Sequence, residues 1–501
     1  MKTSNMNTTN APTFFWHDYE TFGLSPAKDR PAQFAGVRTD MDLNEIGEPL
    51  MLYCQLPMDY LPSPESTLIT GITPQFCNEH GVPEPQFAQA IVRELATPET
   101  IGVGYNTIRF DDEVTRFMLW RNLFPPYKRE FEQGCSRWDV IDVVRCAYAL
   151  RPEGIVWPTH PDTGQTSLRL EDLTVANGLA HESAHDALSD VRATIVLAKL
   201  IKTRQPRLFE FALKLRQKKA VQDEIGWPFD VKKSPKPFLH ISRMFGAQRR
   251  YLAVVYPLAI HPTNKNELIV WDLAFDPVQL LGLTVAQMRE RMFTATADLD
   301  ERGLARLPLK TIHINKSPMV IAQLKTLNDA QSAACGVDWD VVEQHESTAV
   351  THFNALQKID WAAVFERDYD DAGRSAEEML YGGGFVPDSD YRTAEQVLDA
   401  QRQPRDMQSN SKQPNFKDAR LSELWWLYRA RHFPHTLTAT ERERWHDWCA
   451  QRLLGDGQNG GVDEWLAQLN ELGQQHSDQP DKLALLQTLY EYGQSLADGL
   501  N

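Results

Sequence analysis

Cysteines are few in this sequence, and they are not arranged for a metal site or a disulfide framework. Six cysteines are scattered along 501 residues without a Cys-x-x-Cys pair, which argues against a structural zinc site and against a disulfide-held fold. Apolar runs are also short, and none approaches the about 18 residues that a membrane-spanning helix needs. We therefore expect packed free thiols and no membrane association.

Residues 1–12 lack the apolar core of a secretory signal peptide. They are rich in Asn and Thr and contain a single Lys, so they have the composition of neither a signal peptide nor an anchor. A cytoplasmic location is the expectation that follows. The chain as a whole is 42% hydrophobic, which is ample for real cores, and its length suggests about three domains.

Positive charge is scarce, with 52 Lys plus Arg against 68 Asp plus Glu and a net charge of −16. This balance disfavours a protein that binds nucleic acid over most of its surface, because phosphates are bound only where Lys and Arg are clustered. Residues 202–250 reverse the balance with 13 basic and 4 acidic residues, a net charge of +9 that leaves −25 for the rest. Such a run is typical of a solvated face. Beside the acidic motifs described next, we interpret it as a wall that guides a nucleic acid strand.

The first acidic motif is Asp18-x-Glu20, within the aromatic run at residues 14–20. Residues 13–19 are predicted to form a buried strand, and alternation along a strand places both carboxylates on one face, where they can share a cation. Desolvation of two adjacent acids is costly unless a metal or a basic partner compensates, and hard divalent cations prefer oxygen ligands. Alone, such a pair is more typical of an ordinary strand end that faces water, so it needs partners elsewhere in the chain.

Two further acids accompany predicted helices. Asp111 follows a glycine-punctuated apolar run and begins a helical pattern, where the helix dipole favours a carboxylate in any case. Asp190 lies on the small and apolar stripe of a helix predicted at residues 186–202, so its charge needs compensation. His185 falls about 140° from Asp190 on an ideal helix, and we expect it to approach the site from the helix start.

The order and separation of these motifs resemble a known family. Asp18-x-Glu20, Asn106-x-x-x-Phe110-Asp111 and His185-x-x-x-x-Asp190 resemble the three exonuclease motifs of the DEDDh 3′-to-5′ exonucleases. The chain is more closely similar to the bacterial exonuclease I family of single-strand DNA exonucleases. That likeness is carried by HDYETFG at 17–23, RPAQF at 30–34, FDDEVTR at 110–116, YALRPEG at 148–154, TRQPRLF at 203–209, HINK at 313–316 and YRAR at 428–431.

The resemblance implies Mg²⁺-dependent hydrolysis of single-stranded DNA from its 3′ end, releasing 5′-mononucleotides in DNA repair and recombination. Two Mg²⁺ ions are expected, with Mn²⁺ as a substitute. Asp18, Glu20 and Asp190 are then ligands of one ion, and Asp18 and Asp111 face the other. His185 is the expected general base, because a neutral imidazole accepts a proton near neutral pH.

The resemblance also implies contacts with the DNA strand and with a protein partner. The residues expected to contact DNA are Glu20, Arg116, Tyr127, Arg145, Arg151, Arg169, Arg204 and Phe211. The arginines would grip phosphates, while Tyr127 and Phe211 would stack on bases without reading sequence. Any single arginine is as typical of a weak surface ion pair. The expected partners are single-stranded DNA and the acidic, aromatic-ended C-terminal tail of the single-strand DNA-binding protein, for a monomeric chain.

The predicted architecture has three domains. An α/β, ribonuclease H-like exonuclease domain with a mixed sheet is expected at residues 1–201, an SH3-like β domain at 202–357 and a helical C-terminal domain at 358–501. Strands are expected at 13–19, 35–39 and 51–55, helices at 86–95, 111–120, 139–149 and 186–202, and further short strands between 238 and 314. The glycine-rich segment 381–385 is interpreted as a hinge or close-approach loop, and the polar segment 401–417 as a mobile insertion.

Two alternative functions stay open on the sequence. A DEDDh ribonuclease that acts on RNA 3′ ends has the same three motifs but usually lacks the two additional domains. A catalytically silent single-strand-binding or partner-docking protein is the second alternative, and the presence of all five catalytic-type residues disfavours it.

Overall fold

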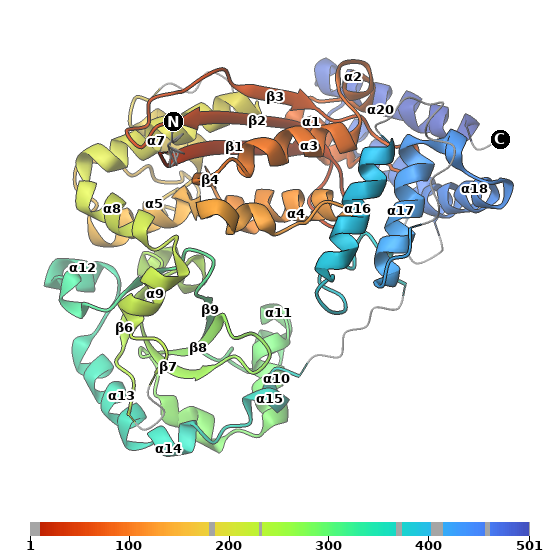
Figure 1. The fold of residues 1–501 in the computed structure, drawn as a ribbon. Helices are drawn as coiled ribbons and strands as arrows, with labels where there is room; N and C mark the ends of the chain where they lie inside the picture. The colour runs from red at the N-terminus through yellow and green to blue at the C-terminus, as the bar shows by residue number, and fades with distance from the viewer. Residues whose placement is uncertain are drawn as a thin grey trace, which may run out of the picture. The chain divides into compact units, whose positions relative to one another are not determined.

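The structure is a computed structural model that describes residues 11–179, 186–229, 233–366, 373–401, 414–455 and 461–499 (Figure 1). The chain divides into two compact units. One contains Met1–Ser136, Glu182–Arg192 and Tyr369–Asn501, and the other contains Arg137–His181 and Ala193–Asp368. Each unit is described by itself.

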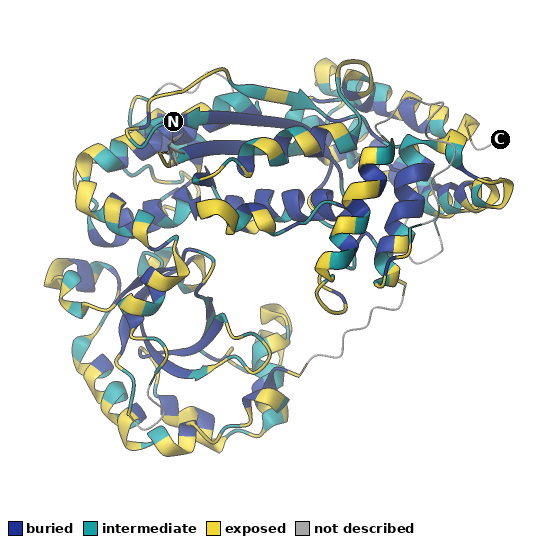
Figure 2. Ribbon diagram, in the orientation of Figure 1, coloured by how far each residue is buried: buried dark blue, intermediate teal, exposed yellow. Residues whose placement is uncertain are grey.

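A mixed sheet has the strand order β3-β2-β1-β4-β5, of which β1 to β4 lie in the first unit and β5 begins at the boundary with the second. Strand β1 pairs antiparallel with β2 and parallel with β4, as the predicted mixed sheet requires. Figure 2 shows that β1 and β2 are largely buried, which explains why their sequences are continuously apolar or aromatic. The strands are β1 (Thr13–Thr21), β2 (Pro31–Thr39), β3 (Leu50–Tyr53), β4 (Thr100–Gly104) and β5 (Ser136–Asp139).

Helices α3 and α4 cover one face of this sheet. Phe15 and Tyr19 of β1 pack with Phe87 of α3 and Met118 of α4 in one buried cluster. Because side chains alternate along a strand, Asp18 and Glu20 point to the opposite face of β1. The helices before the β5 strand are α1 (Pro64–Thr70), α2 (Pro74–His80), α3 (Glu84–Leu95) and α4 (Asp111–Arg121).

The C-terminal helices share cores with the N-terminal part of the first unit. Leu424 and Trp425 of α17 pack with Phe117 and Trp120 of α4, and Trp465 of α19 joins a cluster that also contains side chains near α1. These helices are α16 (Asp388–Gln401), α17 (Ala419–His432), α18 (Ala439–Leu454), α19 (Val462–Gln475) and α20 (Pro480–Asp498).

The second unit is built on an antiparallel sheet in the order β10-β6-β7-β8-β9. Its strands are β6 (Phe238–Ile241), β7 (Leu252–Ile260), β8 (Glu267–Asp272), β9 (Leu309–His313) and β10 (Met319–Ile321). The first helices after β5 are α5 (Val140–Leu150), α6 (Leu170–Ala176), α7 (Ala187–Arg204), α8 (Pro206–Lys214) and α9 (Lys218–Ile225), of which α7 begins in the first unit.

Short helices complete the second unit. They are α10 (Val285–Phe293), α11 (Thr296–Glu301), α12 (Asp329–Ala334), α13 (Trp339–Thr351), α14 (Phe353–Leu356) and α15 (Trp361–Val364). No helix of the described segments is long and apolar enough to cross a membrane. All six cysteines are buried free thiols, as expected from their spacing.

Candidate metal and catalytic site

Three of the predicted metal ligands come together in the first unit. Asp18 and Glu20 lie on the same face of β1, and Asp190 lies in the first turn of α7. One carboxylate oxygen from each residue can be chosen so that all three lie within 4.8 Å of one another. Residues far apart in sequence therefore present oxygen ligands to one point, which is the arrangement that a hard divalent cation requires.

Asp111 joins the same site from the start of α4. Its side chain is buried, and its Oδ1 accepts the backbone N–H of Tyr19 at 3.1 Å. That hydrogen bond ties the carboxylate to the strand residue between Asp18 and Glu20. The charge of Asp111 also contributes to raising the pKa of Asp18 and that of Glu20, so the fourth predicted acid acts on both acids of the strand.

The carboxylates of the site lie close enough together to raise one another's pKa values. Burial raises the pKa of Asp18 well above its usual range, and the charges of Asp111, Glu20 and Asp190 raise it further. Burial, followed by Asp190, Asp111 and Asp186, raises the pKa of Glu20 to about 8. Asp18 and Glu20 therefore bind protons more readily than ordinary carboxyl groups do. An all-oxygen donor set of this charge fits Mg²⁺ or Mn²⁺.

Gln33 of β2 positions the start of α7, a role that the sequence analysis did not identify. It lies opposite Glu20 in the β1–β2 register. Its Nε2 donates to Asp186 Oδ1 at 3.1 Å, and its Oε1 accepts the N–H of Ala187 at 3.3 Å. Asp186 Oδ2 in turn accepts the N–H of Ser189 at 3.2 Å. The available signal was the RPAQF segment, which contains Gln33.

His185, the predicted general base, lies outside the described residues. Its role stays a prediction, based on its spacing from Asp190. The same applies to the greater part of the predicted insertion at 401–417, of which residues 402–413 lie outside the described segments.

Arg116 and Tyr127 are neighbours in the first unit. The Arg116 guanidinium is buried, pairs with Glu130 at 2.7 Å and Glu113 at 2.6 Å, and stacks over the Tyr127 ring with 5.3 Å to its centroid. Its strong hydrogen bonds are thus already made to protein carboxylates. Tyr127 is partly exposed. Both DNA contacts stay predictions, and for Arg116 the geometry favours an indirect role through Tyr127.

The other residues that are predicted to contact the DNA strand belong to the second unit. Arg145 is buried and pairs with Asp142 at 2.6 Å, and Arg151 donates to the Thr326 carbonyl at 3.2 Å. The Arg169 side chain is 66% exposed beside Glu171, and Arg204 is also exposed. Phe211 on α8 is partly buried. The two exposed arginines therefore have the accessibility that a phosphate contact needs, although all five contacts stay predictions.

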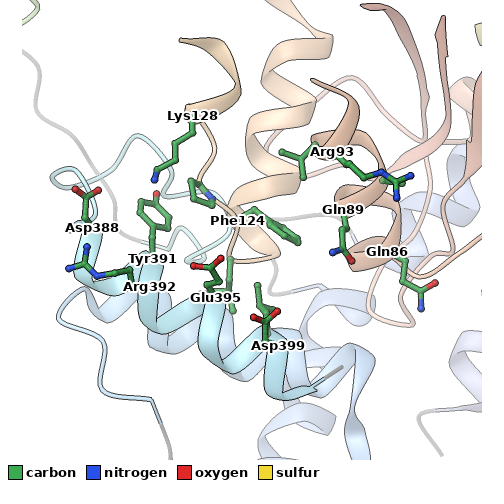
Figure 3. A pocket seen from close by; sticks show the side chains of 15 residues that line it. Gln86, Gln89, Arg93, Phe124, Lys128, Asp388, Tyr391, Arg392, Glu395 and Asp399 are labelled. Atoms are coloured by element: carbon green, nitrogen blue, oxygen red, sulfur yellow. The ribbon is translucent and has the colours of Figure 1, made fainter. Parts of the chain in front are cut away.

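A large pocket in the first unit is separate from the carboxylate cluster. It measures about 910 Å³, and α3 and α16 line it from two sides (Figure 3). Its charged lining is balanced, with Arg93, Lys128 and Arg392 against Asp388, Glu395 and Asp399. None of the four acids of the metal site lines it, so size alone does not identify the catalytic centre.

Comparison with known proteins agrees with these features. Three family models match: "Exonuclease" at residues 15–198, "Exonuclease I SH3-like domain" at 216–367 and "Exonuclease I C-terminal domain" at 374–496. The order is the predicted one, while the predicted boundaries at 201/202 and 357/358 stay predictions.

Individual relatives cover almost the whole chain. An exodeoxyribonuclease I of Haemophilus influenzae is 43% identical over 96% of this chain and 98% of its own length. The crystal structure of Escherichia coli exonuclease I with a dA16 oligonucleotide matches with a TM-score of 0.89 and 42% identity, covering 97% of this chain and all of the other. A structure described as an ExoI/SSB-Ct complex matches with a TM-score of 0.87 and 41% identity, again over 97% and 100% of the two chains.

Proposed function

The chain belongs to the exonuclease I family of enzymes that degrade single-stranded DNA in the 3′-to-5′ direction, and from this premise we propose that Asp18, Glu20, Asp111 and Asp190 hold two Mg²⁺ ions for the hydrolysis. The SH3-like and C-terminal family matches also disfavour the ribonuclease alternative, which lacks those domains.

The observation that carries the proposal is the convergence of Asp18, Glu20 and Asp190 within 4.8 Å. A cluster of half-buried acids destabilises a folded chain unless bound cations or protons offset the repulsion between the carboxylates. When bound, divalent cations supply positive charge that makes water a better nucleophile and stabilises the leaving 3′ oxygen. The raised pKa values of Asp18 and Glu20 support this assignment, because the site accepts positive charge in the form of protons when no cation is bound.

The protein groups then orient the reacting atoms. Strand β1 fixes Asp18 and Glu20 through its pairing on both sides, and the Tyr19 N–H fixes Asp111. Gln33 holds the first residues of α7 against β2, which positions Asp190 at the same point. We assign to His185 the transfer of the proton from the attacking water. Preorganised ligands of this kind avoid a reorganisation cost during the reaction.

The cation assignment is tested by titrating metal-free protein with Mn²⁺ and counting bound ions by electron paramagnetic resonance. The wild type should bind two ions in the presence of a non-hydrolysable single strand, and Mg²⁺ should displace them. Asp190→Asn should lose at least one site, whereas Asp298→Asn, on helix α11 of the second unit, should bind as the wild type. Full Mn²⁺ binding by Asp190→Asn would reject the assignment.

The proposal extends to a protein partner, because one similar structure is a complex of exonuclease I with SSB-Ct. We propose that this chain, acting as a cytoplasmic monomer in DNA repair, binds the acidic C-terminal tail of the single-strand DNA-binding protein at the basic segment 202–250. The complementary charges of the acidic tail and the basic segment support this binding site. A fluorescent tail peptide should bind more weakly as salt rises and when exposed Lys218 and Lys219 are replaced by Gln. Unchanged binding by that variant would show that the tail peptide binds at another site.

A further inference from the structure

A row of three side chains crosses the sheet of the first unit, from the metal site to the edge strand. Glu20 of β1 lies opposite Gln33 of β2, and Gln33 lies opposite Tyr53 of β3. Directly opposite residues on neighbouring strands project to the same face of a sheet, and Figure 1 shows the three strands side by side. Tyr53 therefore lies on the face of the sheet that presents Asp18 and Glu20.

Asp186 directly precedes α7 and caps its first turn. Its Oδ2 accepts the N–H of Ser189 at 3.2 Å, and its carbonyl oxygen accepts the N–H of Asp190 at 3.0 Å. A carboxylate in this position satisfies a backbone N–H group that the helix itself leaves without an acceptor. The metal ligand Asp190 lies one turn after the cap, so the position of its carboxylate depends on the position of Asp186.

The Gln33 amide has a defined orientation because its two ends have different partners. Its Nε2 donates to Asp186 Oδ1 at 3.1 Å and to the Tyr53 hydroxyl oxygen at 3.2 Å, so both of its N–H groups are used. Its Oε1 accepts the N–H of Ala187 at 3.3 Å. The side chain is only 1% exposed. Without the Tyr53 hydroxyl, one N–H of this buried amide would lose its acceptor, which is costly in the protein interior.

Tyr53 is itself held in place by α2 and by the residues that follow this helix. Its ring packs edge-on against Phe76 with 4.9 Å between the centroids, and Phe76 stacks on His80 at 4.4 Å. The Tyr53 carbonyl oxygen accepts the N–H of Val82 at 2.9 Å. A Cβ atom at Gly81 would lie 2.7 Å from that carbonyl oxygen, so the close approach of this segment to β3 requires glycine. The Tyr53 hydroxyl is therefore a preorganised acceptor.

We propose that Tyr53 is a positioning residue of the metal site, acting on Asp190 through Gln33. The hydroxyl fixes the amide, the amide fixes the Asp186 carboxylate that caps α7, and the cap fixes the turn that presents Asp190. The inference rests on the proposed function, because it concerns a ligand of the proposed ions. Residues that orient metal ligands change metal affinity without touching the ion. The site then depends on β3 and α2, which lie outside the three exonuclease motifs.

Tyr53→Phe tests the proposal, because it removes the hydroxyl and keeps the ring that packs on Phe76. Mn²⁺ affinity is measured by electron paramagnetic resonance on metal-free protein. The variant should bind Mn²⁺ about three- to tenfold more weakly than the wild type, the factor expected for the loss of one net hydrogen bond. Its melting temperature in EDTA and its KM for single-stranded DNA at saturating Mg²⁺ should stay near those of the wild type, since neither depends on the cap being held for a cation.

Tyr490→Phe is the matched control. The Tyr490 hydroxyl also accepts a glutamine N–H, from Gln494 Nε2 at 3.0 Å, and it belongs to the same unit as Tyr53. Both members of this pair lie on α20, which carries no proposed metal ligand. Tyr490→Phe should bind Mn²⁺ as the wild type does, and a loss equal to that of Tyr53→Phe would overturn the positioning role.

A double-mutant cycle with Gln33→Met shows whether Tyr53 acts through Gln33. Methionine keeps the length of the side chain and removes its hydrogen bonds to Tyr53, Asp186 and Ala187, so Gln33→Met should bind Mn²⁺ about ten- to a hundredfold more weakly than the wild type. Addition of Tyr53→Phe to this variant should cause no further loss. Losses that multiply in the double variant would overturn the proposal, and so would wild-type affinity of Tyr53→Phe.

The same titration of Asp190→Asn separates this inference from the proposed function. Loss of a Mn²⁺ site by Asp190→Asn together with wild-type binding by Tyr53→Phe would reject only the role of Tyr53. Wild-type binding by both variants would reject the metal assignment itself, and the positioning role with it.

Discussion

The carboxylates of the candidate metal site lie close enough together to repel one another. Asp18 lies in a strand between aromatic residues, and three other carboxylates act on it. Elementary electrostatics makes this arrangement unfavourable for folding and favourable for binding a doubly charged cation. Removal of the charge of one acid should therefore relieve the loss of folding stability that the repulsion causes. The same change should remove the affinity for the metal ion.

Asp18→Asn tests this opposition between stability and function. The variant should lose hydrolysis of single-stranded DNA, because a ligand of both ions is lost. In EDTA its melting temperature should equal or exceed that of the wild type, because burial and like charges no longer act on an ionisable group. Mg²⁺ should raise the melting temperature of the wild type but not of the variant. A variant that unfolds in EDTA would instead show that Asp18 has a structural role.

The metal-free protein should lose stability as the pH rises toward 8. The pKa of Glu20 is raised from 4.5 to about 8 in the folded chain. Between these values the folded state binds more protons than the unfolded state, so the free energy of unfolding falls with rising pH. Thermal unfolding in EDTA from about pH 5 to about pH 8 measures this slope. Glu20→Gln should have a shallower slope, and equal slopes would contradict the shifted pKa.

His185→Ala is expected to separate binding from turnover. Its affinity for Mn²⁺ and for single-stranded DNA should stay near that of the wild type, while kcat falls by about two to four orders of magnitude, the usual share of a general base. His446→Ala, which removes an exposed imidazole on α18, is the matched control and should be fully active. Near-normal kcat in the His185 variant would exclude it from proton transfer.

At the scale of elements, buried ion pairs join distant segments of the first unit. Glu377 pairs with Arg30 at 3.2 Å and with Arg431 at 2.5 Å, and Arg431 also pairs with Asp59 at 2.6 Å. All four side chains are at most 4% exposed. The two arginines hold the pKa of Glu377 well below its usual range. The network therefore fixes α17 and the segment before α16 to the loops that follow β1 and β3.

Glu377→Gln should be strongly destabilising, because it leaves two buried guanidinium groups with too little negative charge. We expect the free energy of unfolding to fall by about 3–5 kcal/mol, measured by urea denaturation with tryptophan fluorescence. The adjacent Glu378→Gln is the control. Glu378 approaches Lys28 at 4.0 Å, and that lysine is 58% exposed. A glutamine in this position can still accept the hydrogen bond that the Ser375 hydroxyl donates to Oε1 at 3.1 Å, so loss of the charge should cost about 0–1 kcal/mol. Similar losses in the two variants would mean that the network does not stabilise the fold.

Local patterns predicted the elements that carry strong periodicity. The strand at 13–19 and the helices at 86–95, 111–120, 139–149 and 186–202 are observed as β1, α3, α4, α5 and α7, with ends that differ by up to two residues. The short helices α1 and α2 and the strands β5 and β10 were not predicted. Each spans at most seven residues, too few for a period to become distinct.

The sequence could not reveal which side chains pair with each other when they are far apart along the chain. The convergence of Asp18, Glu20 and Asp190 could be predicted because these acids occur in a known motif order. The partners of Arg116, Glu113 and Glu130, could not be predicted, and its contact with DNA stays a prediction. Arg30 and Glu377 are 347 residues apart, and Arg420 holds the 381–385 loop, whose glycines suggested either a hinge or a close-approach loop. No local pattern specifies such partners.

At the scale of the whole molecule, negative charge dominates and basic residues are concentrated. The net charge of −16 includes a segment, 202–250, that carries +9. Because an acidic surface repels DNA and a basic one attracts it, this distribution should restrict a strand to a limited part of the surface. A strand confined in this way can be presented by its end to the carboxylates, which is what an exonuclease requires.

The most direct test of the central claim is the digestion of one single-stranded DNA labelled at either its 3′ or its 5′ end. After treatment with EDTA, the wild type should release nothing. On addition of Mg²⁺ it should release the 3′ label at once as a mononucleotide and the 5′ label only at the end of the strand, while Asp18→Asn releases neither. Immediate release of the 5′ label, release in EDTA, or an active Asp18→Asn variant would contradict the account.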